Sequence, residues 1–267
     1  MTGPILVTGG TGVLGRLVVA RLAADGHPVR VMSRRPRPRD DDRAGVEWAT
    51  ADLTSGQGVD AAVAGTGAIV HCATALSGRR EPELARVLTD AARRAGSPHL
   101  VYVSIVGVDR VPFPYYRGKL AAEQLIERSG VPCTVQRATQ FHDLLRTVFA
   151  SAAKSPLMPV PDLPFQPVDA GEVAVRLARL AVERPGGRAA DLGGPQVRDA
   201  RSLARAYLAA TGRRRLLLPL RLPGAVFGAY RRGGHLAREH AEGTVTFEAY
   251  LAARTTGLNS ASYRGPR

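Results

Sequence analysis

The chain has 267 residues, of which 45% are hydrophobic, and a formal net charge of +14. No apolar run approaches the roughly 20 residues of a membrane-spanning helix, and the first residues lack the basic segment and cleavage site of a secretion signal. The basic residues are scattered and nearly all arginine, without a zinc finger or a helix-turn-helix pattern, so we expect a cytoplasmic protein that binds neither membranes nor nucleic acid.

The first half of the chain alternates short apolar runs with helical patterns. Strands are predicted at residues 5–7, 29–32, 46–49, 68–72, 99–104 and 133–136. Helices are predicted at residues 13–22, 81–94 and 115–129. Strands that alternate with helices predict βαβ units, and right-handed crossovers then give an α/β fold with a Rossmann-type, doubly wound parallel sheet.

The pattern loosens past residue 140. Prolines predict a loop with room for one short strand at residues 155–167, and residues 216–222 are apolar but interrupted by Pro219. Between and around these segments we predict a helix at 170–182, a strand at 189–192 and a helix at 202–211. We expect one domain over residues 1–267, comprising a cofactor-binding core (1–137), a small C-terminal substrate lobe (138–254) and a mobile tail (255–267).

The two cysteines, Cys72 and Cys133, lie in apolar strand-like runs. Because disulfides are uncommon in the cytosol, we expect both to be buried free thiols. No metal site is expected, since the pair His71-Cys72 has no further partners at ligand spacing.

The junction between the first predicted strand and helix carries three glycines spaced three apart. It reads Thr8-Gly9-Gly10-Thr11-Gly12-Val13-Leu14-Gly15. Gly9 would permit a tight turn, Gly12 the close approach of a pyrophosphate, and Gly15 the packing of helix on strand. Free N–H groups at the helix start would then hold the phosphates. We predict that a dinucleotide contacts Gly9, Thr11, Gly12, Val13, Leu14 and Gly15; the alternative is a glycine-rich turn without a ligand.

The end of the second predicted strand bears on the choice of cofactor. Sites for NAD(H) usually carry an Asp or Glu there for the ribose 2′-hydroxyl, whereas this chain has Ser33-Arg34-Arg35. Arg34 can pair with a 2′-phosphate and stack on the adenine, so Ser33 and Arg34 predict NADP(H) in preference to NAD(H). Asp40-Asp41-Asp42 lies too far along the loop to act as the acid. The alternative interpretation is that Arg34 and Arg35 are ordinary surface arginines.

The form of the turn resembles that of the atypical short-chain dehydrogenases/reductases, especially their NmrA-like, NAD(P)H-binding branch. Asp52-Leu53 after the third strand is similar to the family's adenine-contacting pair, and Ala73 ends the fourth strand where these proteins wall the cofactor. Gln140 and Phe141, after the sixth strand, resemble the stretch that lines the substrate pocket. The resemblance implies the fold but not one reaction, because the branch includes reductases, quinone oxidoreductases and cofactor-sensing proteins.

Tyr115 and Lys119 form a Tyr-x-x-x-Lys pair on a predicted helix, and four residues apart their side chains face the same way. The resemblance implies that the tyrosine exchanges a proton with the substrate, while the lysine bonds the nicotinamide ribose and makes the phenol easier to ionise. Lys119 is one of only two lysines in the chain. An aromatic residue that merely packs at the start of the helix is the alternative interpretation of Tyr115.

The family's third catalytic element is a serine, and here it is displaced. Ser104 ends the fifth predicted strand, slightly closer to Tyr115 than the family spacing, and Ile105, Val106 and Gly107 follow where the catalytic serine usually stands. Ser104, Gln140 or His142 could supply the hydrogen bond to a substrate oxygen. His142 is more simply interpreted as a partly exposed loop residue.

Two functions follow from these patterns. The first is an NADP(H)-dependent oxidoreductase that reduces a carbonyl, quinone or conjugated olefin, with epimerase-like chemistry as a variant; the leucine- and proline-rich segments favour a hydrophobic small-molecule substrate. The second is a non-catalytic, NADP(H)-sensing regulatory protein that binds a protein partner. The sequence leaves the substrate and a homo-oligomeric state open.

Overall fold

The first strand, β1 (Ile5–Thr8), is apolar and completely buried, as expected of a central strand covered on both faces. It pairs in parallel with β2 (Val29–Ser33) on one side and β4 (Ala68–His71) on the other. The full sheet has the order β3-β2-β1-β4-β5-β6-β9. Its other strands are β3 (Val46–Thr50), β5 (His99–Ile105), β6 (Cys133–Ala138) and β9 (Gly187–Arg188). The computed structural model describes residues 3–38, 45–75 and 77–255.

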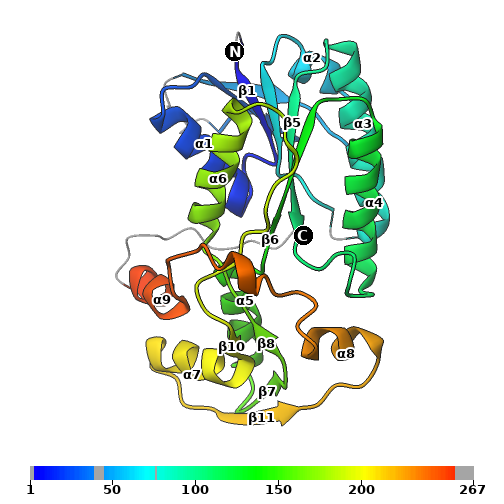
Figure 1. Ribbon diagram of the computed structural model, residues 1–267. Helices are drawn as coiled ribbons and strands as arrows, with labels where there is room; N and C mark the ends of the chain where they lie inside the picture. The colour runs from blue at the N-terminus through cyan, green and yellow to red at the C-terminus, as the bar shows by residue number, and fades with distance from the viewer. Residues whose placement is uncertain (1–2, 39–44, 76, 256–267) are drawn as a thin grey trace. The chain divides into compact units, whose positions relative to one another are not determined.

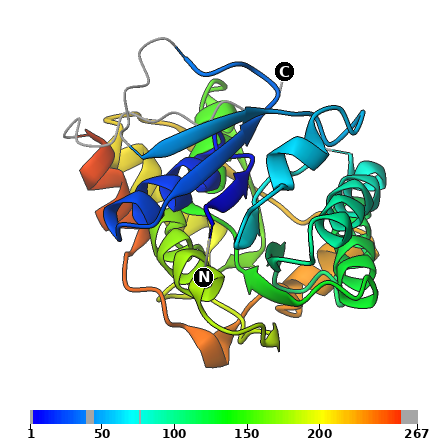
Figure 2. The same ribbon diagram turned by 90° about the horizontal axis from the view of Figure 1, so that it is seen from above.

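Helices cover both faces of this sheet (Figures 1 and 2). On one face lie α1 (Val13–Ala24) and α6 (Ala170–Val182); on the other lie α3 (Glu81–Arg94) and α4 (Pro114–Arg128), with the short α2 (Val59–Val63) beside α3. A short 3₁₀ turn, η1 (Gly78–Arg80), leads into α3. Both layers of apolar side chains are thereby buried, which is the doubly wound arrangement that the sequence predicts.

The chain divides into two compact units. The first contains the seven-stranded sheet and comprises residues 1–104, 114–136 and 173–189. The second comprises residues 105–113, 137–172 and 190–267. The single domain with a substrate lobe, which is expected from the sequence, stays a prediction.

The second unit combines short strands with small helices. Strands β7 (Leu157–Pro161) and β11 (Leu216–Leu220) pair in parallel, and β8 (Pro164–Phe165) pairs antiparallel with β10 (Arg198–Asp199). Its helices are α5 (His142–Ala152), α7 (Ala200–Ala210), α8 (Ala225–Arg231), α9 (Phe247–Thr255) and the 3₁₀ turn η2 (Arg238–His240). Its core gathers aromatic and leucine side chains, among them Phe149, Leu203, Tyr207, Phe247 and Tyr250.

Several expectations for the second half of the chain are wrong. Residues 189–192 do not form a strand: β9 is Gly187–Arg188, and only a single bridge joins Leu192 to Ala138. The proline-rich loop contains two strands, and β11 accommodates Pro219 because it belongs to a two-stranded sheet. Helices α2, α5, α8 and α9 were not predicted from the sequence. Asp40 to Asp42 lie outside the described residues. Of the expected mobile tail (255–267), Thr255 is the last residue of α9, and residues 256–267 lie outside the described residues.

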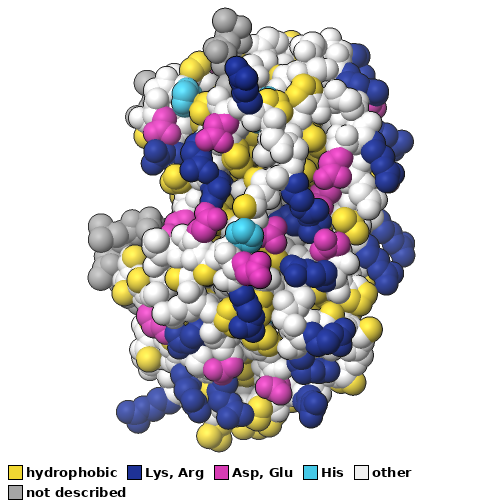
Figure 3. All heavy atoms as spheres, viewed as in Figure 1, with side chains coloured by type: hydrophobic (Ala, Val, Ile, Leu, Met, Phe, Trp, Pro, Cys, Tyr) yellow, Lys and Arg dark blue, Asp and Glu magenta, His cyan; other side chains and the backbone are white. Residues whose placement is uncertain are grey.

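Both cysteines are free thiols, as expected, although each is half-buried and not fully buried. Basic and acidic side chains are interspersed over the face shown in Figure 3, without a single continuous basic stripe. Within residues 3–38, 45–75 and 77–255, no helix combines the length and apolarity that crossing a bilayer requires.

Candidate functional site

The glycine-rich turn between β1 and α1 depends on the absence of side chains. Gly9 has a φ of +64°, which is the left-handed region, and the N–H of Gly12 donates to its carbonyl over 2.9 Å. A Cβ on Gly15 would lie 2.2 Å from the Gly9 oxygen. Gly9 therefore makes the turn, and Gly15 lets the helix pack on it, which are the roles expected from the spacing.

The N-terminus of α1 is open to an anion. Gly12 caps the helix without a side-chain hydrogen bond, and the first turn contains no acidic residue. The N–H groups of a first helical turn have no partner within their helix, so they are available to a phosphate. Thr11 and Gly12 are exposed, Val13 is half-buried, and Leu14 is buried and packs inward. The turn thus fits a diphosphate at its backbone.

The end of β4 lies against this turn because β4 is the parallel neighbour of β1. Ala73, which the sequence places in the cofactor wall, donates its N–H to the hydroxyl of Thr8 over 3.2 Å. The same hydroxyl lies 2.7 Å from Nδ1 of His71. A Cβ on Gly9 would lie 2.7 Å from the Ala73 nitrogen. The structure therefore brings Ala73 and the glycine turn together.

Ser33 and Arg34 stand at the end of β2, in the same unit. The Ser33 hydroxyl accepts from the N–H of Arg35 over 3.1 Å, while the side chain of Arg34 is exposed. In the described part of the chain, Arg34 forms no ion pair with an acid. Its guanidinium is therefore available to a phosphate.

The pair Asp52-Leu53 is placed mainly by structural contacts. Asp52 is half-buried, and its carboxylate accepts from the N–H of Thr54 over 2.8 Å, which closes a turn after β3. Leu53 is 6% exposed and packs in the core of the first unit. Contact of this pair with an adenine stays a prediction.

Tyr115 takes part in a chain of polar contacts. Its hydroxyl lies 2.8 Å from Oγ1 of Thr74, which follows β4. The Thr74 hydroxyl in turn donates to Oε1 of Glu81, at the start of α3, and the N–H of Ala75 donates to the same oxygen over 2.6 Å. Tyr115 is half-buried and Thr74 is exposed, so the phenol is accessible at the surface of this unit. These contacts are more than the packing role that was the alternative for Tyr115.

Lys119, one turn after Tyr115, lies inside the first unit. Its Nζ lies 3.5 Å from Oε2 of Glu81, donates to the carbonyl of Val103 over 3.1 Å, and sits 4.5 Å from the centre of the Tyr102 ring. Although burial lowers the pKa of Lys119, the nearby Tyr102 and Glu81 outweigh it and raise that pKa above its ordinary value. Lys119 is therefore a cation, 3% exposed, and its contact with a ribose stays a prediction.

Ser104, the third expected catalytic residue, is 3% exposed at the end of β5. Its hydroxyl has no hydrogen-bond partner among the described residues. A buried hydroxyl without a partner is costly, so a ligand oxygen or a water would satisfy it. No hydrogen bond joins Ser104 to Tyr115 or Lys119 within the described residues.

Gln140, Phe141 and His142 belong to the second unit. The Gln140 carbonyl accepts from the N–H of Val168, and Phe141 precedes α5. His142 is completely buried: it packs against Phe247 and Tyr250, and its Nε2 lies 3.0 Å from the Val245 carbonyl. The expectation of a partly exposed loop histidine is therefore wrong, because the unpredicted α5 and α9 enclose this ring.

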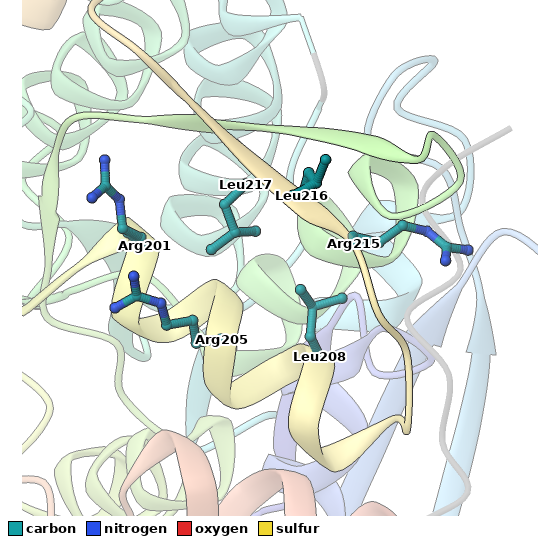
Figure 4. Close-up of a pocket in the computed structure, with 6 residues that line it drawn as sticks. All are labelled: Arg201, Arg205, Leu208, Arg215, Leu216 and Leu217. Carbon is teal, nitrogen blue, oxygen red and sulfur yellow. The ribbon is translucent and has the colours of Figure 1, made fainter.

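An open hollow of about 400 Å³ lies between α7 and β11 in the second unit (Figure 4). Figure 4 shows the guanidinium groups of Arg201 and Arg205 extending to the same side, with Leu208 and Leu217 between the two elements. Arg215 and Leu216 complete the lining. Leu216 and Leu217 belong to the leucine-rich segment that favours a hydrophobic substrate, whereas the other four lining residues were not predicted to bind a ligand. A substrate at this hollow stays a prediction.

Glu81 is the residue that sequence reasoning missed. It was predicted only as the start of a helix, yet it is 1% exposed and joins Thr74 to Lys119. A signal was present, because Glu81 shares the buried stripe of α3 with Leu84, Ala85 and Leu88 at helical spacing. A charged residue on an apolar stripe requires a partner, and Lys119 provides it.

A glycine turn that opens a helix at the end of a buried interior strand of a doubly wound sheet defines a dinucleotide-binding Rossmann fold. The family described as NAD(P)H-binding matches residues 9–155, more than half of the chain. The chain therefore belongs to the NAD(P)H-binding family, which confirms the expected resemblance to the NmrA-like, atypical short-chain dehydrogenases/reductases.

Similar proteins agree with this placement. The (4-alkanoyl-5-oxo-2,5-dihydrofuran-3-yl)methyl phosphate reductase of Streptomyces griseus is 33% identical over 202 residues, covering 74% of this chain and 70% of its own. An NAD(P)H azoreductase of Xenophilus azovorans is 29% identical over 217 residues, covering 78% and 74%. An NADPH-dependent quinone oxidoreductase of Escherichia coli shares the fold at a TM-score of 0.76 and 17% identity, covering 94% of this chain and 99% of its own. The chain is thus an oxidoreductase of this family.

Proposed function

We propose that the chain is an NADPH-dependent reductase of a hydrophobic carbonyl, quinone or conjugated olefin, and that Tyr115 supplies the proton. The observation that carries the proposal is the accessible hydroxyl of Tyr115, held 2.8 Å from Thr74 and one helical turn from the buried Lys119. The reductases among the relatives support the reaction class. The cytoplasmic location and the hydrophobic character of the substrate remain predictions from the sequence.

The cofactor would be held by the first unit alone. Backbone N–H groups from Thr11 to Gly15 would bind the diphosphate, and Arg34 would pair with a 2′-phosphate. Ala73 would wall the cofactor beside the turn, in keeping with its contact with Thr8. A bound nicotinamide supplies the hydride.

The side chains of this unit would handle the proton. Tyr115 donates its phenolic proton to the substrate oxygen, and the positive charge of Lys119, one helical turn away, lowers the cost of the phenolate that remains. Ser104 offers a buried hydroxyl without a partner to a ligand oxygen. The assignment of Gln140 and Phe141 to the substrate stays a prediction from the sequence.

A cofactor-sensing protein is the second candidate, and one observation favours it. The ammonium of Lys119 is already satisfied by Glu81 and the Val103 carbonyl, as a purely structural lysine would be. Such a protein would bind NADPH without turnover and report its level to a protein partner.

Oxidation of NADPH, followed at 340 nm with a panel of quinones, ketones, azo dyes and unsaturated lactones, separates the two candidates. The proposal expects at least one acceptor to be reduced, with NADPH used in preference to NADH. Tight NADPH binding with no turnover of any acceptor would favour the sensor.

A further inference from the structure

Glu81 is surrounded by hydrogen-bond donors. Its Oε1 accepts from the Thr74 hydroxyl and from the Ala75 N–H, while its Oε2 faces the Lys119 ammonium and the Tyr102 hydroxyl, each at 3.5 Å. An ionised carboxylate only accepts hydrogen bonds, so this set of donors matches it fully. The side chain is excluded from solvent, and its charge is balanced by Lys119.

The single proton of the Thr74 hydroxyl decides the direction of the hydrogen bond between Thr74 and Tyr115. A threonine hydroxyl carries one proton, and at Thr74 that proton points to Glu81. The oxygen of Thr74 can therefore only accept from Tyr115, whose hydroxyl lies 2.8 Å away. The resting chain thus runs from Tyr115 to Thr74 to Glu81, and it fixes the phenol in place.

We propose that Thr74 is a catalytic partner of Tyr115 and that Glu81 is its positioning residue, an inference that rests on the proposed reductase. When the Tyr115 O–H bond breaks and an O–H bond forms on the substrate, a phenolate is left. The Thr74 hydroxyl then turns from Glu81 and donates to that phenolate. Glu81 keeps its contacts with Ala75 and Lys119, and a solvent water returns the proton to Tyr115.

The pairing of Thr74 with an acid explains why this hydroxyl can change partners. A hydrogen bond to a charged group is stronger than a neutral one, and the Thr74 proton has an anion on either side, the carboxylate before transfer and the phenolate after it. The exposed position of Thr74 leaves the hydroxyl free to rotate. A threonine that only shaped the loop after β4 would not need its hydroxyl.

Two substitutions at Thr74 separate the hydroxyl from the shape of the side chain. Thr74→Val keeps the shape and should lower kcat about 10- to 100-fold, the usual effect of one hydrogen bond to a charged group, with KM little changed. Thr74→Ser keeps the hydroxyl and should restore kcat to within about 3-fold of the wild type. Thr66→Val, which removes a buried hydroxyl that donates to Val63, is the matched control.

A readout without turnover comes from the NMR signal of the tyrosine ring carbon that bears the hydroxyl, measured in the free protein. The chain has seven tyrosines, and Tyr115→Phe identifies the signal of Tyr115. That signal should move in Thr74→Val and stay in Thr66→Val. It should also move in Glu81→Gln, because Thr74 then loses the anion that fixes its direction.

Each contrary result has its own meaning. A Tyr115 signal that is unchanged in Thr74→Val would overturn the hydrogen bond. A Thr74→Val variant with wild-type kcat, or a Thr74→Ser variant as slow as Thr74→Val, would overturn the role of the hydroxyl. A wild-type protein that reduces no acceptor would end the proposed function together with this role, whereas an active wild type with an equally active Thr74→Val ends this role alone.

Discussion

The ammonium of Lys119 lies 3.5 Å from the carboxylate of Glu81, and the two side chains are 4% and 0% exposed. Removing one partner of such a buried pair leaves an uncompensated charge, which typically costs about 3–5 kcal/mol. We therefore expect Lys119→Met to lower the free energy of unfolding by about that amount in urea denaturation.

The double variant Glu81→Gln/Lys119→Met tests the cause of this loss, because it removes both charges together. It should recover a substantial part of the stability lost in Lys119→Met. A double variant less stable than Lys119→Met would show that the pair does not compensate its own burial.

The stability of the first unit should fall in mild acid. Burial, followed by the charge of Lys119, lowers the pKa of His71 from 6.5 to about 3. The stability contributed by neutral His71 is therefore fully present above pH 6.5. It is lost as the pH falls from 6.5 to about 3, because between these values the unfolded chain binds a proton that the folded chain does not. Well inside this range, one such histidine reduces the free energy of unfolding by about 1.4 kcal/mol per pH unit.

Urea denaturation between pH 7 and pH 4 measures that slope. His71→Gln should show a shallower dependence on pH than the wild type, by about 1 kcal/mol per unit. His142 and His235, whose pKa values burial also lowers, remain in both proteins and should leave a residual slope. Identical slopes in wild type and variant would argue against a buried, neutral His71.

The glycine turn should not tolerate a methyl group at Gly15. A Cβ there would lie 2.2 Å from the Gly9 oxygen, so the turn or the helix would have to shift. Gly15→Ala should therefore weaken NADPH binding at least about 10-fold and destabilise the fold by about 1–3 kcal/mol. Gly186→Ala is the control, since a Cβ at Gly186 meets no atom within 4 Å. Wild-type NADPH affinity in Gly15→Ala would place the diphosphate elsewhere.

Arg34 should determine the preference for NADPH. Loss of a charged pair with the 2′-phosphate should weaken NADPH binding about 10- to 100-fold in Arg34→Ala and change NADH binding by less than about 3-fold. Arg128→Ala, on the exposed side of α4, removes the same charge elsewhere in the unit. Fluorescence titration of both nucleotides measures the two constants. Equal losses for NADPH and NADH would contradict the assignment.

The cofactor-binding half of the fold could be predicted because its signals are local. Buried parallel strands such as β1 are continuous apolar runs, and α3 has the predicted bounds because Gly96 follows its apolar stripe and stops the helical pattern. The second half has short helices and two-residue strands whose identity depends on distant partners. In α5, for instance, His142 is buried against Phe247 and Tyr250 of α9, about a hundred residues away.

The site was predictable where one spacing fixes the geometry. The glycine triplet and the four-residue separation of Tyr115 and Lys119 each imply a local arrangement: Gly12 caps α1, and Tyr115 and Lys119 lie one turn apart on α4. Their contacts with a cofactor or substrate stay predictions. The link from Tyr115 through Thr74 to Glu81 could not be predicted from a single spacing. Tyr115 and Thr74 are 41 positions apart, Thr74 and Glu81 are 7 positions apart, and the three residues belong to different parts of the fold. Only the folded sheet, which sets the end of β4 beside the starts of α3 and α4, brings these residues together.

The most direct test is the rate of NADPH oxidation by Tyr115→Phe, measured beside the wild type with the best acceptor of the panel. The account predicts a fall in kcat of about 10²- to 10⁴-fold, the usual contribution of a positioned acid. The Kd for NADPH should be unchanged, because the proposal assigns the diphosphate to the turn from Gly9 to Gly15 and not to Tyr115. A Tyr115→Phe enzyme that turns over as fast as the wild type would contradict it.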